Sequence, residues 1–168
     1  MRLVIATVSR GSVSLGYRNL YTKLALMCAE REMPFECFDD TTDGEKHQAR
    51  NLVLYKLAEE LDEDDWAYWL DADVAHHPQL VFELLSRDEE IIARNYPIKP
   101  FENNEPAWCG YPVLRKNCVV HSDDTKLVEA VSFGFGAVLM RGRAAKKLRE
   151  RYVFPKATSA TRKLLEAR

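Results

Sequence analysis

From residue 2 to residue 70, continuous apolar segments alternate with segments in which apolar residues recur every three or four positions, as in a helix. This alternation restricts the fold more than any other feature of the chain. Residues 2–9 contain Leu-Val-Ile-Ala-Thr-Val and residues 66–70 are Trp-Ala-Tyr-Trp-Leu. Both runs are typical of strands that are buried on both faces of a parallel sheet. Residues 35–38 predict a shorter strand between them. The order of strand, helix, strand, helix and strand predicts an α/β protein with a mostly parallel central sheet and right-handed crossovers.

Two helices are expected to connect these strands. In residues 16–31 apolar side chains recur every three or four positions, and Pro34 marks the end of that helix. A second helix follows the turn-forming residues 39–44 and carries an apolar stripe that ends at Leu61. Beyond residue 70 the sequence predicts, in order, a short helix over 80–86, a strand over 91–96, a long loop over 97–117, a helix over 123–130, a strand over 133–140 that Gly134 and Gly136 interrupt, and a basic helix over 144–151.

The composition indicates one globular domain over residues 1–168. Hydrophobic residues make up 46% of the chain, and it has only seven Gly and seven Pro, which excludes disordered, collagen-like and small disulfide-bonded proteins. The four cysteines form no CxxC pair and are expected to be reduced thiols. No apolar run approaches the roughly 18–20 residues of a membrane span, and the apolar run after Arg2 is too short for a secretory signal, so we expect a cytoplasmic protein.

The net charge of −2 hides an uneven distribution. Residues 141–168 contain ten Lys or Arg and two Glu, a net charge of +8, so residues 1–140 carry −10. This basic tail indicates either contact with an anionic membrane lipid, an acidic glycan or the donor diphosphate, or an ordinary solvated helix surface. The acidic run over residues 59–65 is interpreted as a solvated helix end and loop. Nucleic-acid binding is excluded as the main role, because the body of the chain is acidic and lacks aromatic residues interleaved on a basic face.

Polar residues that can carry chemistry follow the predicted strands, at the ends where open α/β sheets bind their ligands. Asp71 and Asp73 come directly after the strand over 66–70. If the chain stays extended there, the two carboxylates point to the same side of the sheet. Such oxygen ligands suit Mg²⁺ or Mn²⁺ and leave coordination positions open for water and phosphate oxygens. The alternative is that one aspartate caps a turn and the other is solvated.

Arg50 and two histidines lie close to this aspartate pair in the sequence or in the expected topology. Arg50 lies in the first turns of the second helix, where a guanidinium and the helix N-terminus can bind phosphate oxygens together; alternatively, it pairs with a nearby acidic side chain. His76 and His77 are followed by Pro78, so we expect them on a turn that leaves the site and not as metal ligands.

These motifs resemble nucleotide-sugar glycosyltransferases of the GT-A fold. Residues 39–44, Asp-Asp-Thr-Thr-Asp-Gly, resemble the Asp-Asp-Gly-Ser-Thr-Asp-Gly turn of the inverting family 2. The block Gln-Ala-Arg-Asn at 48–51 and Trp-Ala-Tyr-Trp-Leu-Asp-Ala-Asp-Val at 66–74 is more similar to the fungal mannan-polymerase α-mannosyltransferases, and residues 90–95 and 133–141 continue that similarity. The resemblance implies a Rossmann-like three-layer sandwich. It also implies metal-dependent transfer of a hexose, such as mannose, from a GDP- or UDP-sugar to a hydroxyl acceptor on a glycan, a lipid or a protein glycan.

The resemblance implies roles for individual residues. Asp71 and Asp73 would hold Mn²⁺ or Mg²⁺ with the donor diphosphate, and Arg50 would bind a phosphate. An inverting reaction needs a carboxylate base, for which we assign Glu129, whereas a retaining reaction does not, so the stereochemistry stays open. Other acids that can face the acceptor are Glu105, Asp123 and Asp124. The remaining residues expected to bind the donor are Thr7, Val8, Arg10, Asp39, Asp40, Asn51 and Ala72, within a donor-binding part over residues 1–97 and an acceptor part over 98–168.

Two features depart from the GT-A pattern. Many of these enzymes have a histidine metal ligand beyond the glycine-containing strand, whereas the last histidine here, His121, precedes Gly134. The fungal enzymes also have an N-terminal membrane anchor, and its absence favours a bacterial, phage or viral relative. Two other classes therefore stay open: a domain that binds a nucleotide or glycan without turnover, and a phosphatase of the haloacid-dehalogenase type, whose Asp-x-Asp motif has Thr or Val where Ala75 stands.

Overall fold

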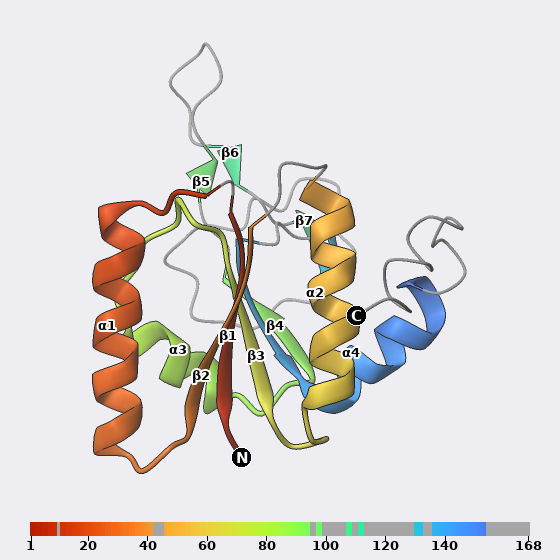
Figure 1. The fold of residues 1–168 in the computed structure, drawn as a ribbon, viewed down its shortest axis with the longest axis horizontal. Helices are drawn as coiled ribbons and strands as arrows, with labels where there is room; N and C mark the ends of the chain where they lie inside the picture. The colour runs from red at the N-terminus through yellow and green to blue at the C-terminus, as the bar shows by residue number, and fades with distance from the viewer. Residues whose placement is uncertain are drawn as a thin grey trace.

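The central sheet has five strands, four of which run in the same direction (Figure 1). A computed structural model describes residues 1–9, 11–41, 46–94, 97–98, 107–108, 111–112, 130–132 and 136–153. β1 (Leu3–Ser9) pairs in parallel with β2 (Phe35–Thr41) and with β3 (Trp66–Leu70). β9 (Ala137–Arg141) lies antiparallel between β3 and β4 (Ile91–Ala93), giving the order β2-β1-β3-β9-β4. The predicted α/β class with a mostly parallel sheet is confirmed.

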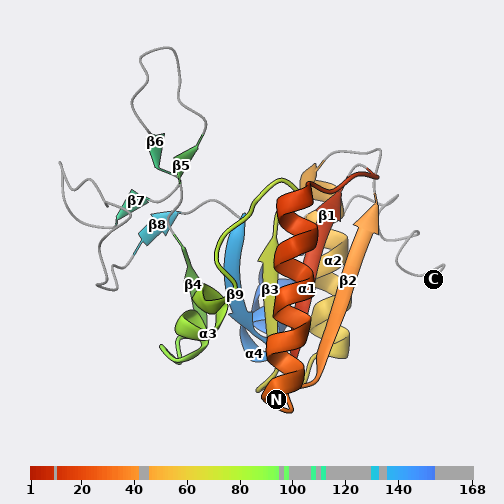
Figure 2. The same ribbon diagram turned by 90° about the vertical axis from the view of Figure 1, so that its left-hand side faces the viewer.

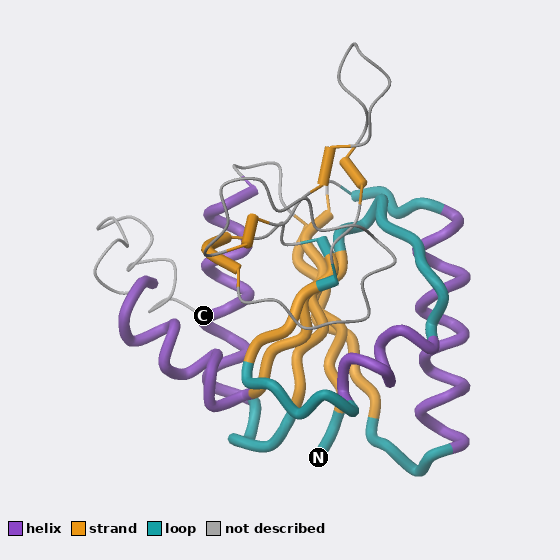
Figure 3. Tube along the Cα trace, turned by 180° about the vertical axis from the view of Figure 1, so that it is seen from behind, coloured by secondary structure: helices purple, strands orange, loops and turns teal. Residues whose placement is uncertain are grey.

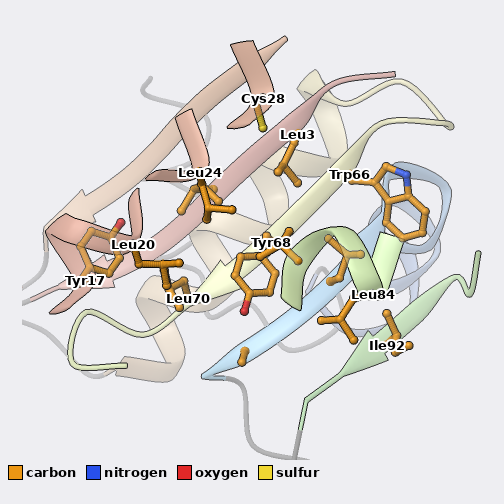
Figure 4. Close-up of a cluster of buried hydrophobic side chains, with 14 residues drawn as sticks. Leu3, Tyr17, Leu20, Leu24, Cys28, Trp66, Tyr68, Leu70, Leu84 and Ile92 are labelled. Carbon is orange, nitrogen blue, oxygen red and sulfur yellow. The ribbon is translucent and has the colours of Figure 1, made fainter. Parts of the chain in front are cut away.

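Helices pack on both faces of this sheet, as Figures 1, 2 and 3 show. α1 (Leu15–Glu30) and α3 (Gln79–Leu85) share one hydrophobic cluster with the sheet, part of which is drawn in Figure 4. α2 (Lys46–Glu60) and α4 (Gly142–Leu148), which continues into a π-helical turn (Arg149–Val153), contact the other face. Successive residues of β1 alternate between the two faces, which explains why this strand is buried along its whole length.

Several elements differ from the expectation. β2 continues to Thr41 because it pairs with β1 along its whole length. The predicted loop over 97–117 contains three two-residue strands: β5 (Pro97–Ile98), β6 (Ala107–Trp108) and β7 (Tyr111–Pro112). Ala130, expected at the end of a helix, lies in β8 (Ala130–Ser132) instead, because it pairs with β7. The rest of that predicted helix lies outside the described residues.

The later strands are shorter than expected. β9 begins only at Ala137, after a turn at Gly136, and β4 ends at Ala93, while Gly134 lies outside the described residues. Cys28 is buried and Cys37 is exposed, and neither of the two forms a disulfide bond. None of the helices in the described ranges combines the length and the apolar composition needed to cross a bilayer.

The acidic run over residues 59–65 is not only a solvated loop, which corrects the interpretation from the sequence. Asp65 is 4% exposed, and its carboxylate accepts hydrogen bonds from the backbone amide of Arg2 at 2.9 Å, from Nε of Arg2 at 2.8 Å and from the amide of Asp62 at 3.1 Å. Burial alone would raise the pKa of Asp65, but these hydrogen bonds outweigh it and lower the pKa below its ordinary value. Asp65 thus joins the start of β1 to the start of β3. These starts lie at one edge of the sheet, which we call the amino edge.

Candidate active site

The carboxyl ends of β1, β2 and β3 meet at the upper edge of the sheet in Figure 1, which we call the carboxyl edge. The strand register places Thr7 opposite Asp39 and Val8 opposite Asp40, so the backbones of four residues predicted to bind the donor are adjacent there. α1 and α2 follow β1 and β2 and therefore begin at the same edge. The N-terminus of a helix favours an anion, because its first N–H groups lack partners within the helix.

Arg50 and Asp71, which were both predicted to belong to the site, contact each other at this edge. Nη2 of Arg50 donates a hydrogen bond to Oδ1 of Asp71 at 2.7 Å, and the two side chains are 27% and 16% exposed. A charge-assisted hydrogen bond between groups partly withdrawn from water is stronger than an ion pair on the open surface. Arg50 therefore orients the Asp71 carboxylate, and its predicted contact with a phosphate stays a prediction.

The residues after β3 form a turn, which we call the acid turn (residues 71–74). The amide of Val74 donates to the carbonyl oxygen of Asp71 at 3.0 Å. The expectation that Asp71 and Asp73 lie on an extended segment is therefore wrong, and the argument that alternate residues point the same way does not apply to them. Asp71 is partly buried and Asp73 is exposed, so the two carboxylates have different surroundings.

Two other predicted donor-binding residues, Thr7 and Val8, lie deeper in the protein. Thr7 is 0% exposed and its hydroxyl is 2.7 Å from the hydroxyl of Tyr17. Val8 is buried in the cluster formed with α2, whereas Asn51 is exposed on that helix. Thr7 and Val8 can therefore influence a ligand through the backbone and through packing. The proposed site residues outside the described ranges are Arg10, Glu105, Asp123, Asp124 and Glu129.

The chemistry of the acid turn suits a divalent ion that shares its ligands with a substrate. In the described part of the chain, no group of three or more His, Cys, Asp or Glu side chains is placed to hold a metal ion. Asp71 and Asp73 offer carboxylate oxygens, which Mg²⁺ and Mn²⁺ prefer, but most coordination positions would have to be filled by phosphate oxygens and water. The residues fit an ion bound together with a phosphate-containing ligand.

A partly buried contact between Tyr68 and His76 was not expected from the sequence, from which Tyr68 was interpreted only as an apolar strand residue. The Tyr68 hydroxyl lies 2.5 Å from Nε2 of His76, and Nδ1 of His76 lies 2.9 Å from the carbonyl oxygen of His77. Burial raises the pKa of Tyr68. Burial also lowers the pKa of His76. The charges of Arg94 and His77 lower this pKa further, whereas the hydrogen bond with the His77 backbone raises it. The signal available in the sequence was a hydroxyl within a buried strand followed by a histidine eight residues later.

The stability that His76 contributes is expected to decrease as the pH falls below about 6.5. The ordinary pKa of this group is 6.5, and the folded protein has a lower value, so the unfolded chain binds more protons between the two. The contribution of His76 to the free energy of unfolding is therefore complete above about pH 6.5 and is lost as the pH falls toward the pKa of the folded state. Urea unfolding of the wild type and His76→Gln from about pH 5 to 8 measures it. An identical pH dependence in both proteins would contradict the expectation.

The fold and site together define an α/β protein whose mostly parallel sheet carries an arginine–aspartate pair and a second aspartate at its carboxyl edge. The chain matches no family model and no curated protein sequence. Its structure is similar to the crystal structure of a glycosyltransferase involved in the glycosylation of the major capsid of PBCV-1, with a TM-score of 0.50 and 12% identity over 95% of this chain and 69% of that one. At this identity the likeness concerns the fold alone, so the protein has a glycosyltransferase-like fold.

Proposed function

We propose that this protein is a metal-dependent glycosyltransferase that moves a hexose from a nucleoside-diphosphate sugar to a hydroxyl acceptor. The observation that carries the proposal is the contact of Arg50 with Asp71, beside Asp73, at the carboxyl edge of a glycosyltransferase-like fold. The N-termini of α1 and α2 begin at the same edge, and they favour an anionic group such as a diphosphate. A three-layer GT-A architecture and a GDP- or UDP-sugar donor belong to this proposal.

The charged residues predicted to bind the donor and the metal ion have distinct chemical roles in the proposed reaction. Asp71 and Asp73 would hold Mn²⁺ or Mg²⁺ together with the donor diphosphate, and a bound ion supplies positive charge that stabilises the leaving group. Arg50 orients Asp71 and adds a fixed positive charge at the same place. Asp39 or Asp40 would form hydrogen bonds with the nucleoside.

The reaction replaces one bond at the anomeric carbon of the sugar by another. The bond to the diphosphate oxygen breaks, the acceptor oxygen binds the same carbon, and the acceptor loses its proton. In an inverting reaction Glu129 would take that proton. A retaining reaction would use a different arrangement of groups around the same donor.

A thermal-shift screen with UDP-, GDP-, CMP- and dTDP-sugars, each with and without Mn²⁺, tests the proposal. A donor present at a hundred times its Kd stabilises the folded state by about 2.7 kcal/mol, which raises the Tm of a chain of this size by about 5–11 °C. We expect such an increase for one nucleotide class, and only with Mn²⁺ present. Sugar transfer to an acceptor panel then follows with the donor so identified.

Two results would contradict the proposal in different ways. Donor binding without hydrolysis or transfer would favour the non-catalytic domain that binds a nucleotide or glycan. Release of phosphate from simple monoesters without any response to nucleotide sugars would favour a phosphatase.

A further inference from the structure

The acid turn is joined to its neighbours by backbone hydrogen bonds. The amide of Asp71 donates to the carbonyl oxygen of Gly136, just before β9, at 3.2 Å. The amide of Ser14, the N-cap residue of α1, donates to the carbonyl oxygen of Ala72 at 2.9 Å. Ala72, which was predicted to bind the donor, therefore offers this carbonyl to α1. These bonds fix the first part of the segment that connects β3 to α3.

The Tyr68–His76 contact fixes the end of that segment. Tyr68 lies three residues before Asp71 and His76 three residues after Asp73, so the hydrogen bond between them closes a loop around the whole motif. Their rings meet edge to face, with centroids 5.7 Å apart and an interplanar angle of 82°. Tyr68 is a firm anchor because it is fully buried among the side chains drawn in Figure 4.

A second contact lies between α1 and the residue that follows the acid turn. Gly16 approaches Ala75 so closely that a Cβ atom added to Gly16 would lie 2.7 Å from the Cβ of Ala75. A larger residue at position 16 must therefore displace Ala75, and Asp73 lies only two residues before it. Ala75 itself is exposed, so its methyl group can be removed with little effect on the core.

We propose that the Tyr68–His76 and Gly16–Ala75 contacts position Asp73 and the acid turn so that they bind a divalent ion together with the donor diphosphate. This inference rests on the proposed function. The chemistry of the first pair supports it, because burying the Tyr68 hydroxyl and partly burying the His76 imidazole costs free energy that an apolar pair would not cost. A directional hydrogen bond at the base of the loop specifies one conformation of the motif. Tyr68, His76 and Gly16 are thus positioning residues.

Tyr68→Phe tests the first contact, because it removes the hydroxyl and keeps the ring. In the free protein we expect amide hydrogen exchange of residues 72–77 to become about tenfold faster, while β1 keeps its wild-type rates. With UDP or GDP as the probe, we expect the apparent Kd for Mn²⁺ to rise about 10–100-fold, which is usual when a residue that supports a metal ligand is changed. The KM for the acceptor should not change. If Tyr68→Phe fails to fold, His76→Leu breaks the same hydrogen bond from its less buried side.

Gly16→Ala tests the second contact and allows a rescue. The variant should show the same faster exchange and weaker Mn²⁺ binding, because the new methyl group displaces Ala75. The double variant Gly16→Ala/Ala75→Gly should recover affinity to within about threefold of the wild type, and Ala75→Gly alone is the matched control. An effect of alanine on the helix propensity of α1, worth up to about 1 kcal/mol, would not be reversed by a change at Ala75.

The outcomes separate this inference from the proposed function. If Asp73→Ala weakens binding of Mn²⁺ with UDP or GDP but Tyr68→Phe and Gly16→Ala behave like the wild type, the positioning role is wrong and the proposed function stands. If the wild type binds neither nucleotide with Mn²⁺, the proposed function fails and the inference fails with it. A double variant as impaired as Gly16→Ala would overturn the role of the Gly16–Ala75 contact.

Discussion

Asp73→Ala is expected to lower transfer from the nucleotide sugar about a hundred- to a thousandfold while the Tm of the protein is unchanged. Such a loss corresponds to about 2.7–4 kcal/mol, the scale observed when one preorganised group that stabilises developing negative charge is removed. The fold should tolerate the change, because Asp73 is exposed and the acid turn is closed by the amide of Val74 and the carbonyl of Asp71. Steady-state kinetics with Mn²⁺ in excess measures the loss.

Two companion variants identify its cause. Glu89→Ala removes another exposed carboxylate, located between α3 and the start of β4, and should transfer sugar at the wild-type rate. Asp71→Asn keeps the shape of the side chain and can still accept the hydrogen bond from Arg50, but it loses the charge, so it should be impaired like Asp73→Ala. Wild-type transfer by Asp73→Ala would mean that this carboxylate binds no ion during the reaction.

The core of the fold could be predicted because its signals are local. The strand over 66–70 agrees with β3, and the helix expected over 16–31 agrees with α1 to within one residue at each end. These signals depend only on neighbouring residues: an apolar run of five residues for the strand, and an apolar stripe repeating every three or four positions for the helix. The apolar run in residues 2–9 likewise predicts that β1 is buried on both faces, as the structure shows. These elements suffice to place Asp71 at the end of a central strand.

The parts that could not be predicted depend on residues far apart in the chain. The solvated interpretation of the acidic run failed for Asp65, which is buried and accepts a hydrogen bond from Arg2, 63 residues away in the chain. Arg50 and Asp71 were both expected at the site, but their contact spans 21 residues and requires the packing of α2 against the sheet. The extended geometry expected after residue 70 was replaced by a turn whose backbone groups bond to Gly136 just before β9, to the N-cap residue of α1 and within the turn itself.

The largest expected loss of stability comes from Gly142→Ala at the start of α4. A Cβ atom on Gly142 would lie 1.9 Å from the carbonyl oxygen of Asp62, a main-chain atom that cannot rotate away as a side chain does. Glycine to alanine normally stabilises a helix by about 0.4–1 kcal/mol, but here the steric conflict dominates. α4 must move away from the loop before β3, which weakens the hydrogen bond from the Gly142 amide to the Asp65 carbonyl at 2.8 Å. We expect a loss of about 3 kcal/mol, or a Tm lower by about 6–12 °C.

Lys147→Ala provides the control, since it also introduces an alanine into α4, but at an exposed position where no new Cβ atom is added. Its side chain is 69% exposed and its ion pair with Glu90 is long, so the change should cost less than about 1 kcal/mol. Gly142 lies at the amino edge, across the sheet from the acid turn, so folded Gly142→Ala should bind UDP or GDP with Mn²⁺ as the wild type does. Tyr68→Phe, in contrast, should change the affinity for Mn²⁺ with UDP or GDP strongly. A Tm of Gly142→Ala at or above the wild-type value would contradict this expectation. It would mean that the acidic run around Asp62 moves aside without cost when the methyl group is added.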